Sequence, residues 1–174
     1  MTFFKPNWFL TSIYDLKPAD LRKFDIKTIL TDLDNTLIAW HEPEASAQLQ
    51  QWLDLMHTHQ IQVIVISNNS KRRVQRAVAG LKIPFIHSAF KPFPRGINQA
   101  LKRFDLKKEQ TVMVGDQLLT DMKAGHLAGL RTILVRPLVE TDSWTTKFNR
   151  FLERIIMRRY QQKSSLKWQE HLDD

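Results

Sequence analysis

The chain has 174 residues and a formal net charge of +8, with 26 lysine and arginine residues against 18 aspartate and glutamate residues. It contains no cysteine, which excludes a disulfide framework and thiolate chemistry, and no apolar run approaches the roughly 20 residues that span a bilayer. The N-terminus lacks a signal-peptide pattern, so we expect one cytoplasmic domain. Its positive charge favours polyanionic partners: nucleic acid, an anionic membrane surface or phosphorylated substrates.

Apolar, β-branched runs alternate with segments of helical periodicity after residue 26. In chain order we expect a strand at 28–31, a helix at 43–59, a strand at 61–66, a helix at 71–81, a short strand at 83–86, a helix at 94–104, a strand at 111–114, a helix at 120–128 and a strand at 131–135. This alternation predicts an α/β fold: a Rossmann-like, doubly wound parallel sheet of about five strands with helices on both faces. We expect a single domain over residues 1–174, with its parts as follows: a core at about 26–137, an N-terminal aromatic segment at 1–25 and a C-terminal basic amphipathic helix at about 143–165.

Two aspartates follow the first predicted strand of this core. Asp32 and Asp34 lie where the strand gives way to a loop, and ligands bind at that edge of open α/β sheets. Side chains two apart in an extended segment point to the same side, so both carboxylates could face one reacting group. One ionised carboxylate could attack phosphorus and its neighbour could pass a proton to the leaving oxygen. Taken alone, such a pair is more often a loop or helix-cap feature, so the prediction depends on the other motifs.

Three further motifs follow the later strands. Ser67-Asn68 closes the second strand, where a hydroxyl and the N–H groups of a helix start could hold phosphate or simply cap the helix. Lys91 follows the third strand, and its ammonium could neutralise a nucleophile and a phosphoryl group, although a lone lysine is usually solvated. Gly115-Asp116 ends the fourth strand, so Asp116 could complete an oxygen site for Mg²⁺. Asp121 could join that site or complement a helix N-terminus.

The complete set of motifs resembles the haloacid dehalogenase superfamily of phosphatases. The pattern is Asp-x-Asp-x-Thr, then Ser after the second strand, then Lys, then Gly-Asp-x-x-x-x-Asp, and it extends over about residues 29–137. The residues of the individual motifs, including Ala89-Phe90-Lys91-Pro92, are similar to those of the YqeG-type branch of this superfamily. That branch is related to phosphatidylglycerophosphate phosphatases. The resemblance therefore implies a Mg²⁺-dependent phosphatase that forms an aspartyl-phosphate.

The resemblance also implies a role for each matching residue. Asp32 is the nucleophile, and Asp34 is the general acid and later the base that activates water. The substrate phosphoryl group is held by Ser67, Asn68 and Lys91. The metal is bound by Asp32, by Asp34 through its backbone carbonyl, and by Asp116. Asp121 is either a further metal ligand or an acid directly behind the ligands.

The spacing of the motifs leaves no room for an inserted cap domain. About two dozen residues separate Thr36 from the second strand, enough for one helix and its turns, and residues 67–91 are likewise filled by a helix and a short strand. We therefore expect an open site without a cap domain. Open sites suit large substrates or substrates embedded in a surface, because small substrates generally need a lid to exclude water.

Both flanks of the core could contact a membrane. Residues 147–167 carry seven basic residues and one acidic residue among apolar residues at helical spacing, a pattern that fits an anionic interface. The N-terminal aromatic residues from Phe3 to Tyr14 could lie beside them at headgroup depth. The alternative is that both flanks pack their apolar stripes on the domain and leave the arginines in water.

Three classes of function fit these observations. The leading one is a phosphomonoesterase acting on an anionic phospholipid, phosphatidylglycerophosphate, with peripheral association at the inner face of the membrane. The second applies the same chemistry to a soluble or nucleic-acid-terminal phosphate. The third is a basic RNA- or ribosome-binding module with vestigial catalytic residues. It is disfavoured because no catalytic position is missing and because the aromatic residues fall at core spacing, not in an RNA-stacking motif.

Overall fold

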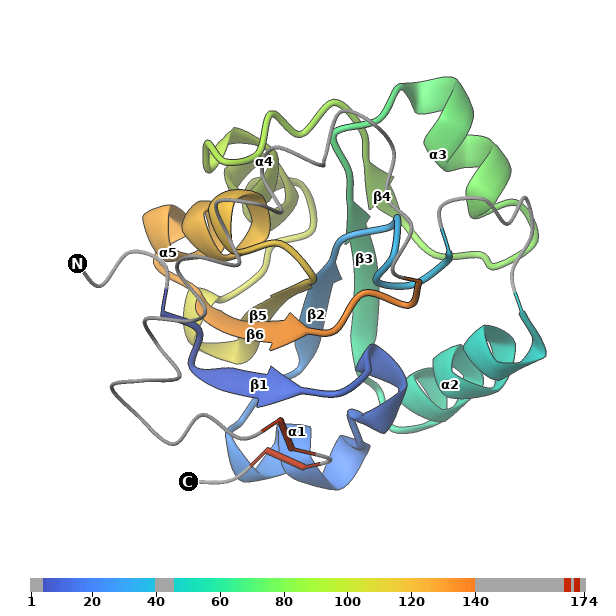
Figure 1. Ribbon diagram of the computed structural model, residues 1–174, viewed down its shortest axis with the longest axis vertical. Helices are drawn as coiled ribbons and strands as arrows, with labels where there is room; N and C mark the ends of the chain where they lie inside the picture. Colours follow the sequence, from blue (N-terminus) through green and yellow to red (C-terminus); the bar gives the residue numbers. More distant parts are fainter. Residues whose placement is uncertain (1–4, 40–45, 140–167, 170, 173–174) are drawn as a thin grey trace.

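The computed structural model of the protein describes residues 5–39, 46–139, 168–169 and 171–172. Within these residues, six parallel strands form one sheet in the order β1-β6-β5-β2-β3-β4 (Figure 1). The strands are β1 Trp8–Leu10, β2 Thr28–Thr31, β3 Gln62–Ile66, β4 Phe85–Ile86, β5 Thr111–Gly115 and β6 Arg131–Val135. The predicted α/β fold is confirmed, but the sheet has six strands and not about five. The additional strand, β1, lies outside the core expected at 26–137 and pairs with β6.

The helices cover both faces of this sheet. They are α1 Pro18–Lys23, α2 Ala47–Thr58, α3 Lys71–Ala77, α4 Arg95–Arg103 and α5 Lys123–Ala128, with 3-10 turns at Ile13–Asp15 and Lys108–Gln110 and a π-helical turn at Leu118–Met122. Figure 1 shows α4 and α5 on one side and α1 and α2 on the other. The predicted helices at 71–81 and 94–104 are therefore shorter than expected, and the predicted helix at 120–128 begins with the π-helical turn.

Alternation along the strands divides the core between the two faces. Ile29 of β2 packs in a cluster with α1, α2 and α3, whereas the next residue, Leu30, packs in a second cluster with α4 and α5. This is the period of two that places successive side chains on opposite faces of a strand. Because both faces are covered, β2 and β5 are buried along their whole lengths, as expected for a parallel sheet.

The N-terminal aromatic segment packs on the domain. Trp8, Phe9 and Ile13 are buried, so for these residues the alternative of packing on the domain is confirmed, and a position at headgroup depth is not found. Phe3 is outside the described residues. The uninterrupted apolar run of the three-residue strand β1 fits a buried strand and a membrane-facing surface equally well, so the sequence left both open.

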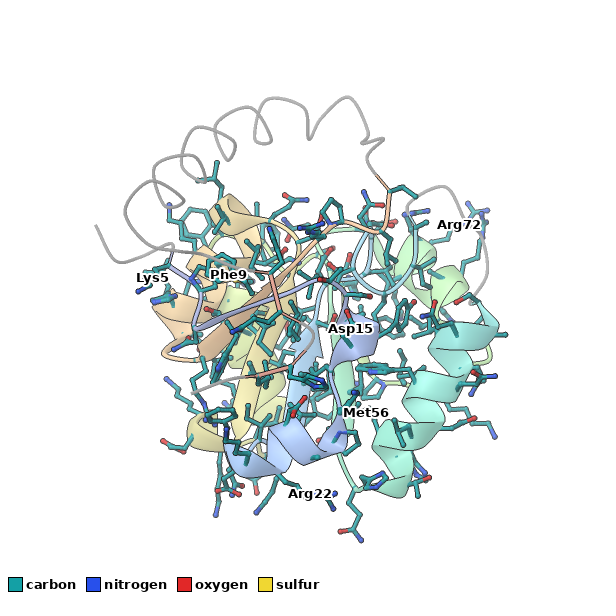
Figure 2. The ribbon with its side chains drawn as sticks, turned by 60° about the horizontal axis from the view of Figure 1, so that its bottom comes forward. Lys5, Phe9, Asp15, Arg22, Met56 and Arg72 are labelled. Atoms are coloured by element: carbon teal, nitrogen blue, oxygen red, sulfur yellow. The ribbon has the colours of Figure 1, made fainter. Side chains whose placement is uncertain are left out.

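The described C-terminal residues return to the same edge of the sheet. Gln169 donates its N–H to Phe9 O at 3.0 Å and accepts from Thr11 N–H at 3.1 Å, while Trp168 makes an edge-to-face contact with Phe9. Figure 2 labels Phe9 within this region. The predicted basic helix at about 143–165 lies outside the described residues. The described residues Trp168 and Gln169 lie beside β1.

Within the described ranges, no helix is both long and apolar enough to cross a membrane. The chain between β2 and β3 contains α2, and the chain between β3 and Lys91 contains α3 and β4, so these connections hold no cap domain in their described parts. α2 begins after Ser46, whose Oγ accepts a hydrogen bond from Leu49 N–H at 3.2 Å. This cap satisfies one of the exposed N–H groups at the helix start.

Candidate active site

The central strand β2 is the point at which the strand order of the sheet reverses. From β2 the chain continues outward through β3 and β4, and β5 then returns to the opposite side of β2 (Figure 1). In such a sheet the loops after the two diverging strands separate and leave a crevice at the carboxyl ends. Asp32 follows β2, Ser67 follows β3 and Asp116 follows β5, so three of the predicted residues reach this crevice from three adjacent strands.

Lys91 reaches the crevice from the loop after β4. Its Nζ lies 2.5 Å from Asp32 Oδ1 and 2.7 Å from Asp121 Oδ1, and all three side chains are buried. A lysine that is 7% exposed is not the solvated residue that a single lysine in a loop suggests. The structure therefore places an ammonium directly against the carboxylate that the sequence predicts as the nucleophile.

Three buried carboxylates lie together beside Lys91. One oxygen from each of Asp32, Asp116 and Asp121 falls within 4.8 Å of the others. Thr36 Oγ donates a hydrogen bond to Asp116 Oδ1 at 3.2 Å, which orients that carboxylate. Buried charges of one sign need compensation, and the Lys91 ammonium contacts two of the three carboxylates, those of Asp32 and Asp121. Carboxylate oxygens are the donors that Mg²⁺ prefers, so the cluster fits a divalent cation.

Asp121 is held in this cluster by the turn that follows β5. The π-helical turn Leu118–Met122 brings the residue back toward its own strand, and Gln117 N–H donates to Asp121 Oδ2 at 3.1 Å. Gly115 is required for this approach, because a Cβ at that position would lie 2.3 Å from Asp121 Oδ2. The Asp121 carboxylate therefore lies among the acids and contacts Lys91, and its assignment as a metal ligand or as an acid behind the ligands stays a prediction.

We expect Gly115→Ala to damage the site far more than its size suggests. The added methyl group overlaps the whole Asp121 side chain, with Cγ at 2.4 Å and Cβ at 2.5 Å, so Asp121 must leave its position beside Lys91. The expected result is a protein destabilised by about 1–3 kcal/mol, the usual cost of overpacking, with at least tenfold weaker binding of a divalent cation. Thermal unfolding and metal titration measure the two effects.

Gly80→Ala is the matched control for the added methyl group, since no atom lies near its added Cβ, although its positive φ carries its own strain. Metal binding equal to wild type in Gly115→Ala would contradict this account of Asp121.

Burial and the neighbouring charges shift two protonation equilibria here. Burial raises the pKa of Asp32 to about 8, and the carboxylates of Asp121 and Asp116 act in the same direction, while the Lys91 ammonium opposes them. For Lys91, burial alone lowers the pKa. The carboxylates of Asp121 and Asp32 outweigh burial, so the pKa of Lys91 lies above its ordinary value and the ammonium stays charged. A bound cation would oppose the rise at Asp32 and favour the ionised, nucleophilic form.

The Lys91 loop is positioned by Asn68. Lys91 N–H donates to Asn68 Oδ1 at 2.7 Å, and Asn68 Nδ2 donates to Lys91 O at 2.9 Å. Both ends of the Asn68 amide are therefore used to hold the loop. The sequence predicts this residue as a phosphate ligand, whereas the structure gives its side chain the task of fixing Lys91.

Ser67 is buried at the end of β3, and α3 begins at Lys71, as predicted, with Ser70 as its N-terminal cap residue. A role for Ser67 and this helix start in holding phosphate stays a prediction. In the structure the Ser67 hydroxyl accepts hydrogen bonds from the N–H and the Nδ2 of Asn69, each at 3.2 Å. Its position on the strand next to β2 still brings it to the same edge as Asp32.

Asp34 has two partners that the sequence analysis missed. Asn69 Nδ2 donates to its Oδ2, and Arg73 of α3 lies 2.5 Å from its Oδ1. Asn69 also contacts Ser67, so one amide joins the predicted general acid to the predicted phosphate ligand. In the sequence, the one indication of the contact with Arg73 is that an arginine lies in the first turn of a helix that starts at the carboxyl edge of the sheet. That signal is weak, because α3 carries four basic residues and the sequence does not say which one turns inward.

The comparisons with known proteins identify the family of the chain. A family model of HAD-hydrolase-like proteins matches residues 89–155. The probable phosphatase YqeG of Bacillus subtilis (strain 168) is 42% identical over 168 residues, which make up 97% of this chain and 98% of that protein. The chain belongs to the haloacid dehalogenase superfamily of phosphatases. The family predicted from the motifs is thereby confirmed.

Two solved structures share the fold. The cobalt-bound deoxy-D-mannose-octulosonate 8-phosphate phosphatase YrbI of Haemophilus influenzae is similar with a TM-score of 0.52 and 21% identity, over 64% of this chain and 68% of that chain. A thermostable NPPase of Geobacillus stearothermophilus gives a TM-score of 0.54 with 18% identity, over 69% of this chain and 92% of that chain. At these identities the similarity concerns the fold of the domain.

Proposed function

We propose that this superfamily member is a Mg²⁺-dependent phosphatase that hydrolyses a phosphomonoester through an aspartyl-phosphate on Asp32. The observation that carries the proposal is the buried contact between Lys91 Nζ and Asp32 Oδ1 at 2.5 Å, within a cluster of three carboxylates. A buried carboxylate that faces both an ammonium and a cation-binding set is suited to attack an anionic phosphoryl group, because both positive charges offset the repulsion between the two anions.

The proposed reaction has two displacement steps at phosphorus. A carboxylate oxygen of Asp32 attacks phosphorus, the bond from phosphorus to the leaving oxygen breaks, and Asp34 supplies the proton that this oxygen takes up. A water molecule then attacks phosphorus and gives its proton to Asp34. The bond between Asp32 and phosphorus breaks, and inorganic phosphate leaves.

Ser67 and Lys91 hold the phosphoryl oxygens in both steps. Asp32, Asp116 and the backbone carbonyl of Asp34 are the proposed metal ligands, and the position of the Asp121 carboxylate beside those of Asp32 and Asp116 supports its addition to this set. A bound Mg²⁺ would supply positive charge at the phosphoryl oxygens.

Asp34 has to be released before it can transfer a proton. Both of its oxygens are paired in the structure, one with Asn69 and one with Arg73. The Arg73 contact is the more exposed of the two, with the arginine side chain 43% exposed, so a substrate anion can compete for the guanidinium from solvent. We propose that this competition frees one oxygen of Asp34 when substrate enters.

For the substrate we propose an anionic phospholipid with a terminal phosphomonoester, phosphatidylglycerophosphate. Three features support a lipid: the net charge of +8, the short connections that leave no cap domain in their described parts, and the resemblance of the motifs to the branch related to phosphatidylglycerophosphate phosphatases. The location that follows is the cytoplasm, with peripheral association at the inner face of the membrane. A screen of the purified protein with Mg²⁺ against phosphorylated lipids, sugars and nucleotides tests the assignment. Preference for a soluble phosphate would replace the lipid by the second class of substrate.

The basic segment 147–167 is expected to contribute to membrane binding. Each basic side chain near an anionic surface contributes about 1 kcal/mol, screened within a Debye length. Replacing Arg154, Arg158 and Arg159 by glutamine should therefore weaken co-sedimentation with phosphatidylglycerol liposomes by tenfold or more at low salt, and high salt should release the wild type. A control variant with glutamine at Lys102, Arg103 and Lys107 removes the same charge elsewhere. Equal binding by both variants and the wild type would exclude a role for this segment.

A further inference from the structure

Two phenylalanines flank the buried lysine of the site and point into solvent. In the described part of the chain, four large apolar side chains are exposed: Leu55, Phe90, Phe93 and Leu127. Phe90 is 57% exposed and Phe93 is 65% exposed, whereas Lys91 between them is 7% exposed. Single exposed apolar residues are ordinary on a protein surface. Two rings within four residues, on either side of the lysine that contacts the nucleophile, form a local apolar surface that the rest of the mechanism does not use.

The loop that carries these rings is firmly attached to the domain. Ala89 N–H donates to Ser67 O at 2.9 Å, Phe93 N–H donates to Phe90 O at 2.9 Å, and Gly96 N–H donates to Ala89 O at 3.1 Å. The loop also passes so close to α4 that a Cβ on Gly96 would lie 2.5 Å from Ala89 Cβ. The two rings therefore cannot turn into the core without breaking contacts that also position Lys91.

The backbone at Phe90 shows how its ring is kept outside. Its φ is +58°, a left-handed conformation that L-residues with large side chains rarely adopt. The neighbouring residues Ala89 and Lys91 are both buried, so this conformation lets one aromatic residue face solvent between two inward-facing ones. Neither ring contributes to the core, and the apolar surface is stabilised only if something covers it.

The charge around this surface is positive. The Arg95 guanidinium lies 5.3 Å from the centre of the Phe90 ring. At the carboxyl edge, α3 begins with Lys71, Arg72 and Arg73, and α4 begins with Arg95. Figure 2 shows Arg72, at the start of α3, at the opposite end of the domain from Arg22 of α1. Aromatic rings beside cationic side chains match the interface of an anionic bilayer, where rings settle at headgroup level and basic groups meet lipid phosphates.

We propose that Phe90 and Phe93 insert into the headgroup region of an anionic phospholipid bilayer and hold the Lys91 loop at the lipid surface. Because both rings project from the loop that carries Lys91, insertion brings the mouth of the site to the phosphate layer. The proposal rests on the proposed function for its choice of a lipid substrate, but the docking itself can be measured without catalysis.

The first experiment compares vesicle binding of full-length variants. In Phe90→Asn the ring is lost and the left-handed backbone is retained, since asparagine tolerates positive φ better than most residues. The variant Phe90→Asn/Phe93→Ser should bind phosphatidylglycerol vesicles at least tenfold more weakly than wild type in co-sedimentation. The matched control, Leu55→Gln/Leu127→Gln, removes two exposed apolar side chains elsewhere and should bind as wild type does. Equal binding by all three proteins overturns the proposal.

A second experiment reports insertion at the residue itself. The chain has no cysteine, so Phe93→Cys can carry a single environment-sensitive fluorophore, with Leu127→Cys as the control. We expect a blue shift on addition of phosphatidylglycerol vesicles at position 93 and none at position 127. No shift at 93, or equal shifts at both positions, overturns the proposal. A shift that depends on protein concentration without vesicles identifies a second copy of the chain as the occupant and also overturns it.

Activity toward soluble p-nitrophenyl phosphate separates this inference from the proposed function. Hydrolysis of this substrate by a wild type that does not bind vesicles would overturn the docking and leave the phosphatase. Vesicle binding that requires the two rings, in a protein that never hydrolyses a phosphomonoester, would overturn the proposed function and leave the docking.

Discussion

Replacing Asp32 with asparagine is expected to reduce hydrolysis of every phosphomonoester to the background of the buffer. The amide has nearly the same shape as the carboxyl group but has no negative oxygen with which to attack phosphorus. The fold should survive, because a neutral group in this buried position removes one of three crowded carboxylates, and burial already raises the pKa of Asp32 to about 8. Steady-state assays and circular dichroism measure the two expectations.

Trapping experiments on the same variant identify the intermediate. Beryllofluoride bound to an aspartate mimics an aspartyl-phosphate, so wild type should bind it with Mg²⁺ and Asp32→Asn should not. Asp54→Asn is the matched control, since Asp54 is an exposed residue of α2 whose carboxylate accepts a hydrogen bond from Gln50 Nε2. Full activity in Asp32→Asn would exclude a nucleophilic role for this residue, whereas loss of activity with retained trapping would assign the nucleophile to another group.

Position on the sheet explains why much of the site could be predicted from the sequence. Asp32, Ser67 and Asp116 each end a recognisable strand, and parallel strands bring their carboxyl ends to one edge whatever the details of packing. Lys91 could be placed by the same rule once the short strand at Phe85–Ile86 was recognised. This rule predicts which edge of the sheet a residue reaches, and it therefore predicted which residues form the site. Their roles came from the resemblance to the family.

The remaining features depend on geometry that no local pattern contains. Asp121 enters the acidic cluster because a π-helical turn follows β5, and a helix predicted from periodicity at 120–128 gives no indication of that turn. The contact between Arg73 and Asp34 joins residues 39 apart in the chain. Likewise, β1 is stabilised by β6 and by Gln169, and a three-residue strand whose partners lie so far away has no signature of its own.

The metal requirement gives the second large expected effect. Removal of divalent ions should abolish activity. Asp116→Ala should raise the Mg²⁺ concentration for half-maximal activity by about 100-fold or more. Loss of a residue that only hydrogen-bonds to a metal ligand already weakens metal binding by about 10–100-fold, and Asp116 is itself a proposed ligand. Thr36→Val supplies a graded comparison. It removes the hydroxyl that orients Asp116 at 3.2 Å but keeps the shape of the side chain, so an effect of about tenfold is expected. Normal turnover by protein treated with EDTA would refute the metal assignment.

The raised pKa of Asp32 adds a pH dependence whose sign follows from the binding equilibrium. With the pKa at about 8, the Asp32 carboxyl is mostly protonated at pH 6 in the metal-free protein, and a cation binds only after that proton has left. Apparent affinity for Mg²⁺ should therefore rise about tenfold for each pH unit between 6 and 8 and level off above 8, since one proton is exchanged per ion. Calorimetric titration in buffers of different ionisation enthalpy measures that proton directly. Asp32→Asn should bind the ion more weakly and release no proton, so an unchanged proton release in this variant would assign the titrating group to another carboxyl of the cluster.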